Sequence, residues 1–208
     1  MKLACQNIRN LFFIVAIGFA VTGCASAKKS GFITDFERMP RGEHVDRFRS
    51  NPQLLTGEAL AHVYVAEVDT SSVKDAPKVN SKELAGLLRQ AVNDALKQKG
   101  FTPEGDRGAA TSELQLAISE LNPGDATARI IAAELGAGHA KVQVDGKLVS
   151  KSGAEIAAFV DRRNSSGAIG FSDVGGDAGP KLMEDLLRKI AIKAVDDLRS
   201  EVGRLTRF

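Results

Sequence analysis

The stretch between residues 139 and 163 constrains the fold of this chain most, because it joins two extended segments by a turn. Residues 139–150 alternate between apolar and polar side chains, which is typical of a β-strand with one buried face. Residues 151–153 (Lys-Ser-Gly) form a turn sequence, and residues 154–163 supply a partner strand. We therefore predict an antiparallel hairpin, and with it a β-sheet.

The same alternation predicts two further strands, at residues 60–68 and 112–121. Residues 122–125 (Asn-Pro-Gly-Asp) end the second of these strands, since all four residue types favour turns. Residues 126–135 fit either a short helix or an irregular strand, and the pattern leaves both open.

Two amphipathic helices are predicted, one in the middle of the chain and one near its end. The first spans residues 81–99, with Asn80 and Glu83 as a capping box and Gly100 in the position of a C′ glycine. The second opens at Pro180, since proline suits the first helical position, and its apolar residues recur at helical spacing. Each helix thus has one apolar face to lay on a core.

The order strand, helix, three strands, helix predicts the α+β class. We expect a single domain in which a mostly antiparallel or mixed sheet of about four to five strands is covered by the two amphipathic helices.

The first 23 residues have the three-part layout of a secretory signal. Lys2 and Arg9 precede an uncharged apolar run at residues 11–21, and the small-residue pair Thr22-Gly23 follows it. Eleven residues of helix rise only about 16 Å, against roughly 30 Å of bilayer hydrocarbon. We therefore expect residues 1–23 to be a cleaved export signal, with a retained N-terminal anchor as the alternative.

The end of this segment, Val21-Thr22-Gly23-Cys24, resembles the lipobox of bacterial lipoproteins. The resemblance implies cleavage between Gly23 and Cys24 and a covalent diacylglycerol and N-acyl lipid on Cys24, with no other cofactor. In the proteins it resembles, a residue such as Ala25 after the cysteine accompanies sorting to the outer membrane. The resemblance therefore implies a lipid anchor in the outer membrane, with the protein on the periplasmic face.

Removal of the signal changes the net charge of the chain, and a strongly positive net charge would favour anionic binding partners. Lys2 and Arg9 are the only charged residues of 1–23, so cleavage brings the 28 Lys and Arg down to the number of Asp and Glu, 26. A formally neutral chain with 5% aromatic residues lacks the charge and the stacking platforms of a nucleic-acid-binding protein, so we expect no nucleic acid partner. Cys5 leaves with the signal and Cys24 would be acylated, which leaves no free thiol for chemistry.

Residues 24–55 begin with the lipidated Cys and are rich in charge, without a sustained helical or alternating pattern. We interpret them as a charged tether, whose apolar residues Phe32, Ile33 and Phe36 dock on the folded part. The periplasmic α+β domain is then expected to occupy residues 56–208.

The glycine-rich loop at residues 164–180 is the one candidate for a ligand site, with five glycines in seventeen residues. Free N–H groups before a helix can bind a phosphate, but Pro180 removes one donor and Asp177 would repel an anion. We therefore interpret the segment as a flexible loop. The candidate loop residues are Gly175, Gly176, Asp177 and Gly179.

Patterns for catalysis or metal binding are missing from the sequence. His44, His62 and His139 lie in separate segments, without a second His or a Cys at ligand spacing. Asp161 and Asp173, close to the glycine-rich loop, are expected to be solvated carboxylates. A Gly-x-Ser-x-Gly elbow is missing too, so we predict neither a metal site nor an enzyme.

A second resemblance extends into the mature chain. Cys24 followed by residues 30–36 (Ser-Gly-Phe-Ile-Thr-Asp-Phe) is similar to a Ser-Gly-Phe-Leu-x-Asp-Tyr segment in an uncharacterised family of proteobacterial lipoproteins. Residues 136–144, followed by the hairpin, the glycine-rich loop and a terminal helix, resemble the same group. Since that family has no established activity, the resemblance implies a location and a fold but no catalytic residues.

Two functions remain open on these observations. The first is an outer-membrane-anchored periplasmic lipoprotein without catalysis, which binds an envelope protein partner or has a structural role. The alternative is a small-ligand-binding or enzymatic protein with a cleft at the glycine-rich loop 164–180.

Overall fold

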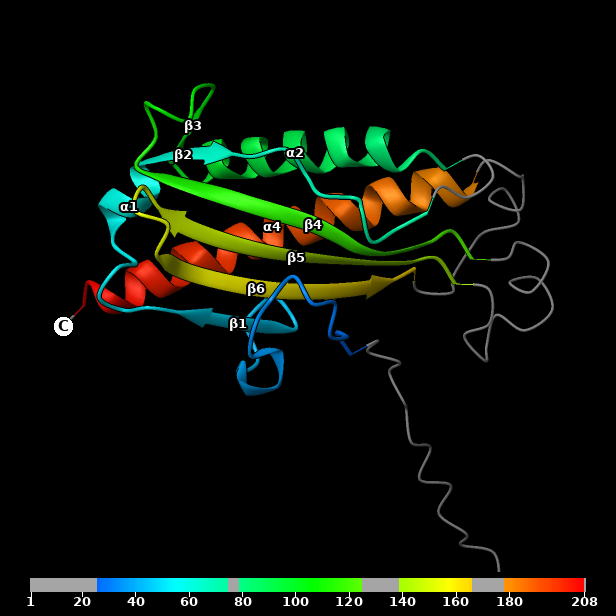
Figure 1. The fold of residues 1–208 in the computed structure, drawn as a ribbon, viewed down its shortest axis with the longest axis horizontal. Coiled ribbons are helices and arrows are strands. Elements are labelled where there is room, and N and C mark those ends of the chain that lie inside the picture. Colours follow the sequence, from blue (N-terminus) through cyan, green and yellow to red (C-terminus); the bar gives the residue numbers. More distant parts are fainter. Residues whose placement is uncertain (1–25, 75–78, 125–138, 166–177, 208) are drawn as a thin grey trace, which may run out of the picture.

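A mixed β-sheet forms the centre of the computed structural model, which describes residues 26–74, 79–124, 139–165 and 178–207 (Figure 1). The strands of the described residues are β1 (Arg47–Ser50), β2 (His62–Val65), β3 (Thr102–Glu104), β4 (Ser112–Asn122), β5 (Lys141–Ser150) and β6 (Glu155–Asn164). Their order in the sheet is β1-β6-β5-β4-β2-β3. The helices are the 3-10 turn η1 (Phe36–Arg38), α1 (Gly57–Ala61), α2 (Ser81–Gln98) and α4 (Ala178–Leu205).

The predicted hairpin is confirmed. β5 pairs antiparallel with β6 on one side and with β4 on the other. At the turn, the Ser150 N–H donates to the Ala154 carbonyl at 2.9 Å, and Gly153 has a φ of 84°, which glycine adopts without strain. β2 runs parallel to both of its neighbours, β3 and β4, so the sheet is mixed.

Both long helices are confirmed. Asn80 accepts hydrogen bonds from the N–H groups of Lys82 and Glu83 at 3.0 and 3.3 Å, so α2 begins at the predicted cap. α2 and α4 lie side by side behind the sheet in Figure 1 and bury the main core between themselves and the strands. None of the described helices is both long and apolar enough to cross a bilayer.

The described part of the sheet has six strands rather than four to five, and α1 adds a short third α-helix. α1 follows Thr56, whose side chain accepts from the Ala59 N–H at 3.1 Å, so the strand expected at residues 60–68 is reduced to β2. β1 and β3 are edge strands of four and three residues. Segments this short hold too few residues for an alternation to show.

The segment expected to be a tether packs on the sheet over its described part. Residues 26–40, which we call the strap, cross the face of the sheet that α2 and α4 leave open, here called the strapped face (Figure 1). β1 then extends the sheet by pairing with residues 157–160 of β6. The folded domain therefore includes residues well before position 56, because the charges of this segment find partners on the sheet. Residues 1–25, with the expected export signal and Cys24, lie outside the described residues.

Candidate functional site

The strap is fixed at its start by the amide of Gln143. The Lys28 N–H donates to Gln143 Oε1 at 2.8 Å, and Gln143 Nε2 donates to the Lys28 carbonyl at 2.7 Å. Gln143 is a β5 residue with only 2% of its surface exposed. Its side chain gives the strap the donor and the acceptor that a neighbouring strand would give, so the chain is held at Lys28.

Asp145, two positions further along β5, holds the next part of the strap. Its carboxylate accepts hydrogen bonds from Ser30 Oγ and, at 3.1 Å, from Gln143 Nε2. Both β5 side chains project from the same face because the period of a strand is two. Burial raises the pKa of Asp145, and the hydrogen bonds from Ser30 and Gln143 oppose the rise. A buried carboxylate without donors is costly, so Asp145 favours the bound strap.

An ion pair crosses the sheet beside Gln143. Glu120 of β4, Gln143 of β5 and Arg162 of β6 are register partners in one row. Arg162 donates to both oxygens of Glu120, through Nε and, at 2.9 Å, through Nη2. This hydrogen-bonded guanidinium lowers the pKa of Glu120. The Lys28 ammonium lies 3.5 Å from the same carboxylate, so the start of the strap joins a charged network on the sheet.

The middle of the strap is held by apolar contacts. Ile33, Phe36 and Met39 form a second, small core with Ala158 and Val160 of β6, and all five residues are buried. The predicted docking of Ile33 and Phe36 is therefore confirmed.

Two cations complete the attachment of the strap. Arg49 of β1 donates to both oxygens of Glu155, at 2.7 and 3.0 Å, and to the Thr34 carbonyl at 2.9 Å. The Lys147 ammonium lies 4.7 Å from the centroid of the Phe32 ring, within the range of a cation–π interaction. The strap is thus attached along its whole length.

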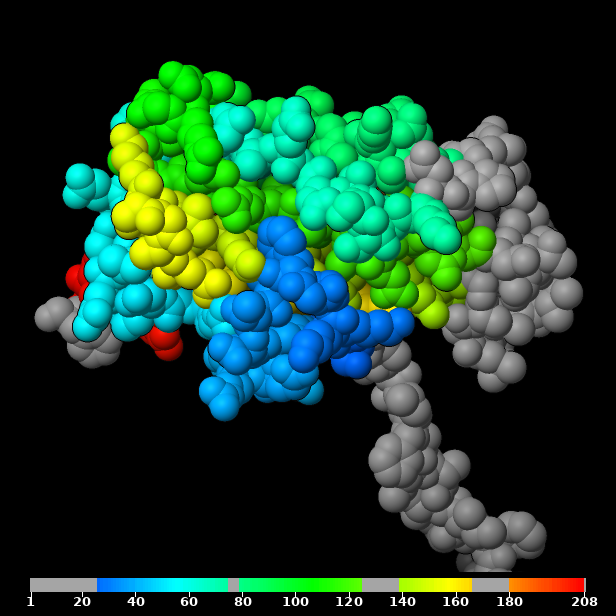
Figure 2. Space-filling view, viewed as in Figure 1, coloured from blue at the N-terminus to red at the C-terminus, as the bar shows by residue number. Residues whose placement is uncertain are grey.

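A hollow of about 750 Å³ opens on the strapped face next to Lys147 (Figure 2). Its two acids are paired, Glu113 with Arg107 at 2.5 Å and Glu155 with Arg49. Within the described part of the chain, Lys147 and Lys151 form no ion pair, so the lining carries a net positive charge. The lining residues are Arg107, Gly108, Ala110, Ser112, Glu113, Gln115, Lys147, Val149, Ser150, Lys151, Ser152, Gly153 and Glu155.

On the helix side of the sheet, Asp197 of α4 holds the loop that leads into β1. Its two carboxylate oxygens accept from the N–H groups of His44 and Val45, at 2.9 and 3.0 Å. A Cβ at Gly42 would lie 2.5 Å from Asp197 Oδ2, so this approach requires glycine. Burial raises the pKa of Asp197, and the hydrogen bonds from the Val45 and His44 N–H groups oppose this rise.

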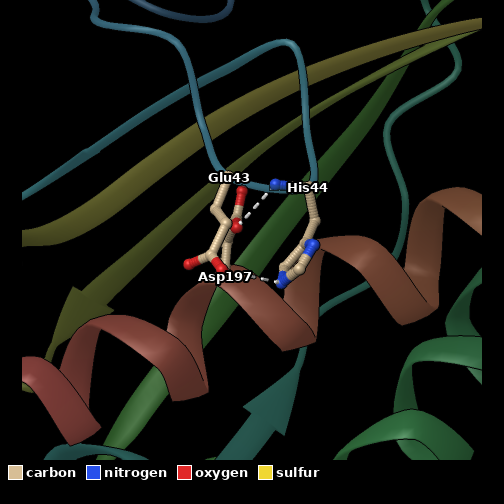
Figure 3. A group of neighbouring side chains, drawn as sticks. All are labelled: Glu43, His44 and Asp197. Carbon is tan, nitrogen blue, oxygen red and sulfur yellow. Dashed lines mark hydrogen bonds and ion pairs between the residues drawn. The ribbon is translucent and has the colours of Figure 1, made fainter.

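Glu43, His44 and Asp197 bring potential metal-ligand atoms within 4.8 Å of one another (Figure 3). The protein itself already engages two of these groups. Asp197 caps the loop amides, and Glu43 Oε2 accepts from Ser200 Oγ at 2.7 Å. Because these hydrogen bonds account for the arrangement, we assign it the role of joining the loop to α4.

Asp161, expected to be a solvated carboxylate, is fully buried, so that prediction was wrong. The residues of the loop before β1 cover it: Asp161 accepts from the Asp46 N–H at 3.2 Å and from Arg163 Nε at 2.8 Å. Burial raises the pKa of Asp161 to about 6, with Arg163 opposing the rise and the charge of Asp46 adding to it. Burial also raises the pKa of Asp46.

The histidines are not brought together among the described residues. His44 lies in the loop before β1, where its N–H donates to Asp197 of α4. His62 Nδ1 lies 2.6 Å from Glu104 Oε1, and half of the His62 side chain is exposed. His139 is half-buried next to β5, and its Nε2 has no hydrogen-bond partner within the described residues.

Of the other predicted site residues, only Gly179 lies in the described part of the chain, in the first turn of α4. Outside it lie Gly23, Cys24, Gly175, Gly176 and Asp177. Gln143 and Asp145 were not among the predicted site residues. They alternate with Val142 and Val144 in the predicted strand, and this alternation is also typical of a strand whose second face is open to solvent.

A mixed sheet with two long helices on one face and an N-terminal strap on the other defines a small α+β domain. The chain belongs to the family described as Domain of unknown function (DUF4410), whose model matches residues 44–169, more than half of the chain. The expectation of an uncharacterised family is thereby confirmed. The matched segment runs from the loop before β1 through β6 and excludes the strap and α4. No curated protein matches the chain.

Several solved structures resemble the fold at low sequence identity. PelC from Paraburkholderia phytofirmans, a dodecamer, is 17% identical with a TM-score of 0.42, covering 69% of this chain and 96% of its own. A Xanthomonas campestris protein of family DUF330 is 14% identical with a TM-score of 0.48, covering 77% and 95%. A DUF4136 protein from Bacteroides thetaiotaomicron is 13% identical with a TM-score of 0.38, covering 76% and 95%. Likeness at this level transfers no activity or partner.

Proposed function

We propose that this chain is a non-catalytic lipoprotein, anchored through acylated Cys24 at the periplasmic face of the outer membrane, that binds an envelope protein partner or has a structural role there. One observation carries the proposal. The strap is fixed to the sheet from Lys28 onward, by hydrogen bonds to residues of the described fold alone. Cleavage between Gly23 and Cys24 would therefore leave the described fold intact.

The chemistry of the proposed anchor is sufficient for stable attachment. Each buried CH₂ contributes about 0.8 kcal/mol, and two or more acyl chains hold a protein on a bilayer where a single myristoyl chain does not. The lipobox residues and the export signal support this anchor. No observation on the described residues supports the alternative, a ligand or enzymatic cleft at residues 164–180, because residues 166–177 lie outside them.

The anchor is tested by intact-mass spectrometry of the protein extracted from membranes. We expect a chain that begins at Cys24 and carries the mass of its acyl groups. Cys24→Ser should abolish acylation and release the protein from the membrane fraction. Cys5→Ser is the matched control, since Cys5 would leave with the signal, and it should change neither. An unacylated thiol at Cys24 in the native product would overturn the proposal.

The partner is tested by photo-crosslinking in intact cells. A crosslinking residue in place of Lys189 on the exposed side of α4 is expected to capture a discrete envelope protein. The same residue in place of exposed Ser152, in the turn between β5 and β6 on the strapped face, is the matched comparison. A protein captured equally from every exposed position would count against a specific interface.

A further inference from the structure

The distance between the proposed acyl group and the first fixed residue is short. Lys28 lies four residues after Cys24, and an extended chain covers at most about 3.6 Å per residue, so the two are separated by roughly 14 Å or less. Lys28 is held by both polar ends of the buried Gln143 amide. The link to the bilayer therefore leaves from the strapped face.

The size of the domain shows why this link would limit its orientation. A domain of about 180 residues has a radius of gyration of roughly 16 Å, which exceeds the length of the link. For α2 and α4 to face the membrane, the link would have to pass around the edge of the sheet. It is too short for that path, so the strapped face stays next to the bilayer.

The hollow lies within reach of the same membrane surface. Lys147 is four residues along β5 from Gln143, a distance of about 13 Å in a strand. Lys147 and Lys151 form no ion pair in the described part of the chain, while the acids Glu113 and Glu155 are both paired. The lining is therefore suited to phosphate groups. Charge alone does not determine which face lies next to the membrane, because α4 also exposes Arg188 and Lys189. The orientation therefore follows from the short link.

We propose that the strapped face lies against the membrane surface and that Arg107, Lys147 and Lys151 contact the headgroups of anionic phospholipids at the hollow. This inference rests on the proposed acylation of Cys24. It assigns the helix side, with α2 and α4, to the periplasm, where a protein partner would meet it.

The orientation is tested with the full acylated protein in vesicles of phosphatidylethanolamine and phosphatidylglycerol. Fluorophores are attached to Ser152→Cys, at the rim of the hollow, or to Gln90→Cys, on the outer side of α2. Lipids with nitroxide headgroups then quench whichever label is near the bilayer. We expect quenching several-fold stronger at position 152 than at position 90.

A longer link supplies the matched control. A linker of about 30 Gly and Ser residues between Ala25 and Ser26, with a root-mean-square length of roughly 30 Å, should bring the two positions closer to equal quenching. Arg107→Glu with Lys151→Glu should weaken quenching at position 152 in anionic vesicles but not in phosphatidylcholine alone.

Each outcome bears on one part of the inference. Equal quenching at both positions, in protein whose acyl groups are verified by mass, would overturn the orientation and leave the proposed anchor standing. If quenching at position 152 changes neither in the charge variants nor when phosphatidylglycerol is left out of the vesicles, the proposed headgroup contact is overturned. Missing acyl groups would overturn the proposed function, and the orientation with it.

Discussion

At the scale of single residues, Gln143 is the side chain on which the position of the strap depends. Its amide makes both backbone bonds to Lys28 and a third bond to Asp145. Gln143→Ala would remove all three and leave Asp145 with fewer donors, at an expected cost of about 1–3 kcal/mol in the free energy of unfolding. Urea denaturation measures this loss.

Gln115→Ala is the matched control for Gln143→Ala. Gln115 is only half-buried on β4, and it donates to Glu113 at 3.2 Å. Its removal should cost less than about 1 kcal/mol. Equal losses in the two variants would contradict the role assigned to Gln143.

Asp161 gives the protein a predictable dependence on pH. Burial raises its pKa to about 6 in the folded state, above about 3.9 for an unfolded aspartate. Between these values the folded state binds more protons than the unfolded one, so this group makes stability fall as the pH rises through about 6. A pKa difference of about two units between the folded and unfolded states corresponds to about 3 kcal/mol in the free energy of unfolding. The free energy of unfolding, measured by denaturation at about pH 4.5 and pH 7, should fall less between these two pH values in Asp161→Asn than in the parent protein. An equal fall in the two proteins would refute the pKa assigned to Asp161.

At the scale of secondary-structure elements, Gly146 of β5 leaves the space that the Phe159 ring of β6 occupies. It is the register partner of Phe159, and a Cβ at position 146 would overlap the ring of this buried side chain. We expect Gly146→Ala to lower the free energy of unfolding by about 1–3 kcal/mol through overpacking. Gly86→Ala is the control, because it lies in α2 with open space around it and should stabilise by about 0.5–1 kcal/mol. Thermal unfolding of both variants checks the opposite signs.

The elements that could be predicted from the sequence are those with local patterns. The hairpin of β5 and β6 and the cap of α2 at Asn80 depend on residues close together in the chain. β1 and the strap depend instead on partners more than a hundred residues away, such as Glu155 for Arg49 and Gln143 for Lys28. A charge-rich segment resembles a solvated tether until such partners are known. The same limit applies to Asp161, whose burial depends on the loop before β1.

At the scale of the whole molecule, the sheet separates two apolar cores of unequal size. The larger lies between the sheet and the two long helices and includes Leu88. The smaller lies under the strap, around Phe36. Since the two cores share only the sheet, opening of the strap need not disturb the larger one. We therefore expect the strap to open as a separate unit at a lower free energy than global unfolding.

Native-state hydrogen exchange tests this separation with two substitutions and two amides. The Lys28 amide, bound to Gln143, reports on the strap, and the amide of buried Val144 reports on the central sheet. Leu88→Ala should lower the opening free energy at Val144 by about 2–5 kcal/mol and leave that at Lys28 unchanged, because the open and closed strap both contain the altered core. Phe36→Ala should lower the opening free energy at Lys28, because only the closed strap buries that ring. An equal fall at both amides in Leu88→Ala would instead mean that strap and sheet unfold as one unit.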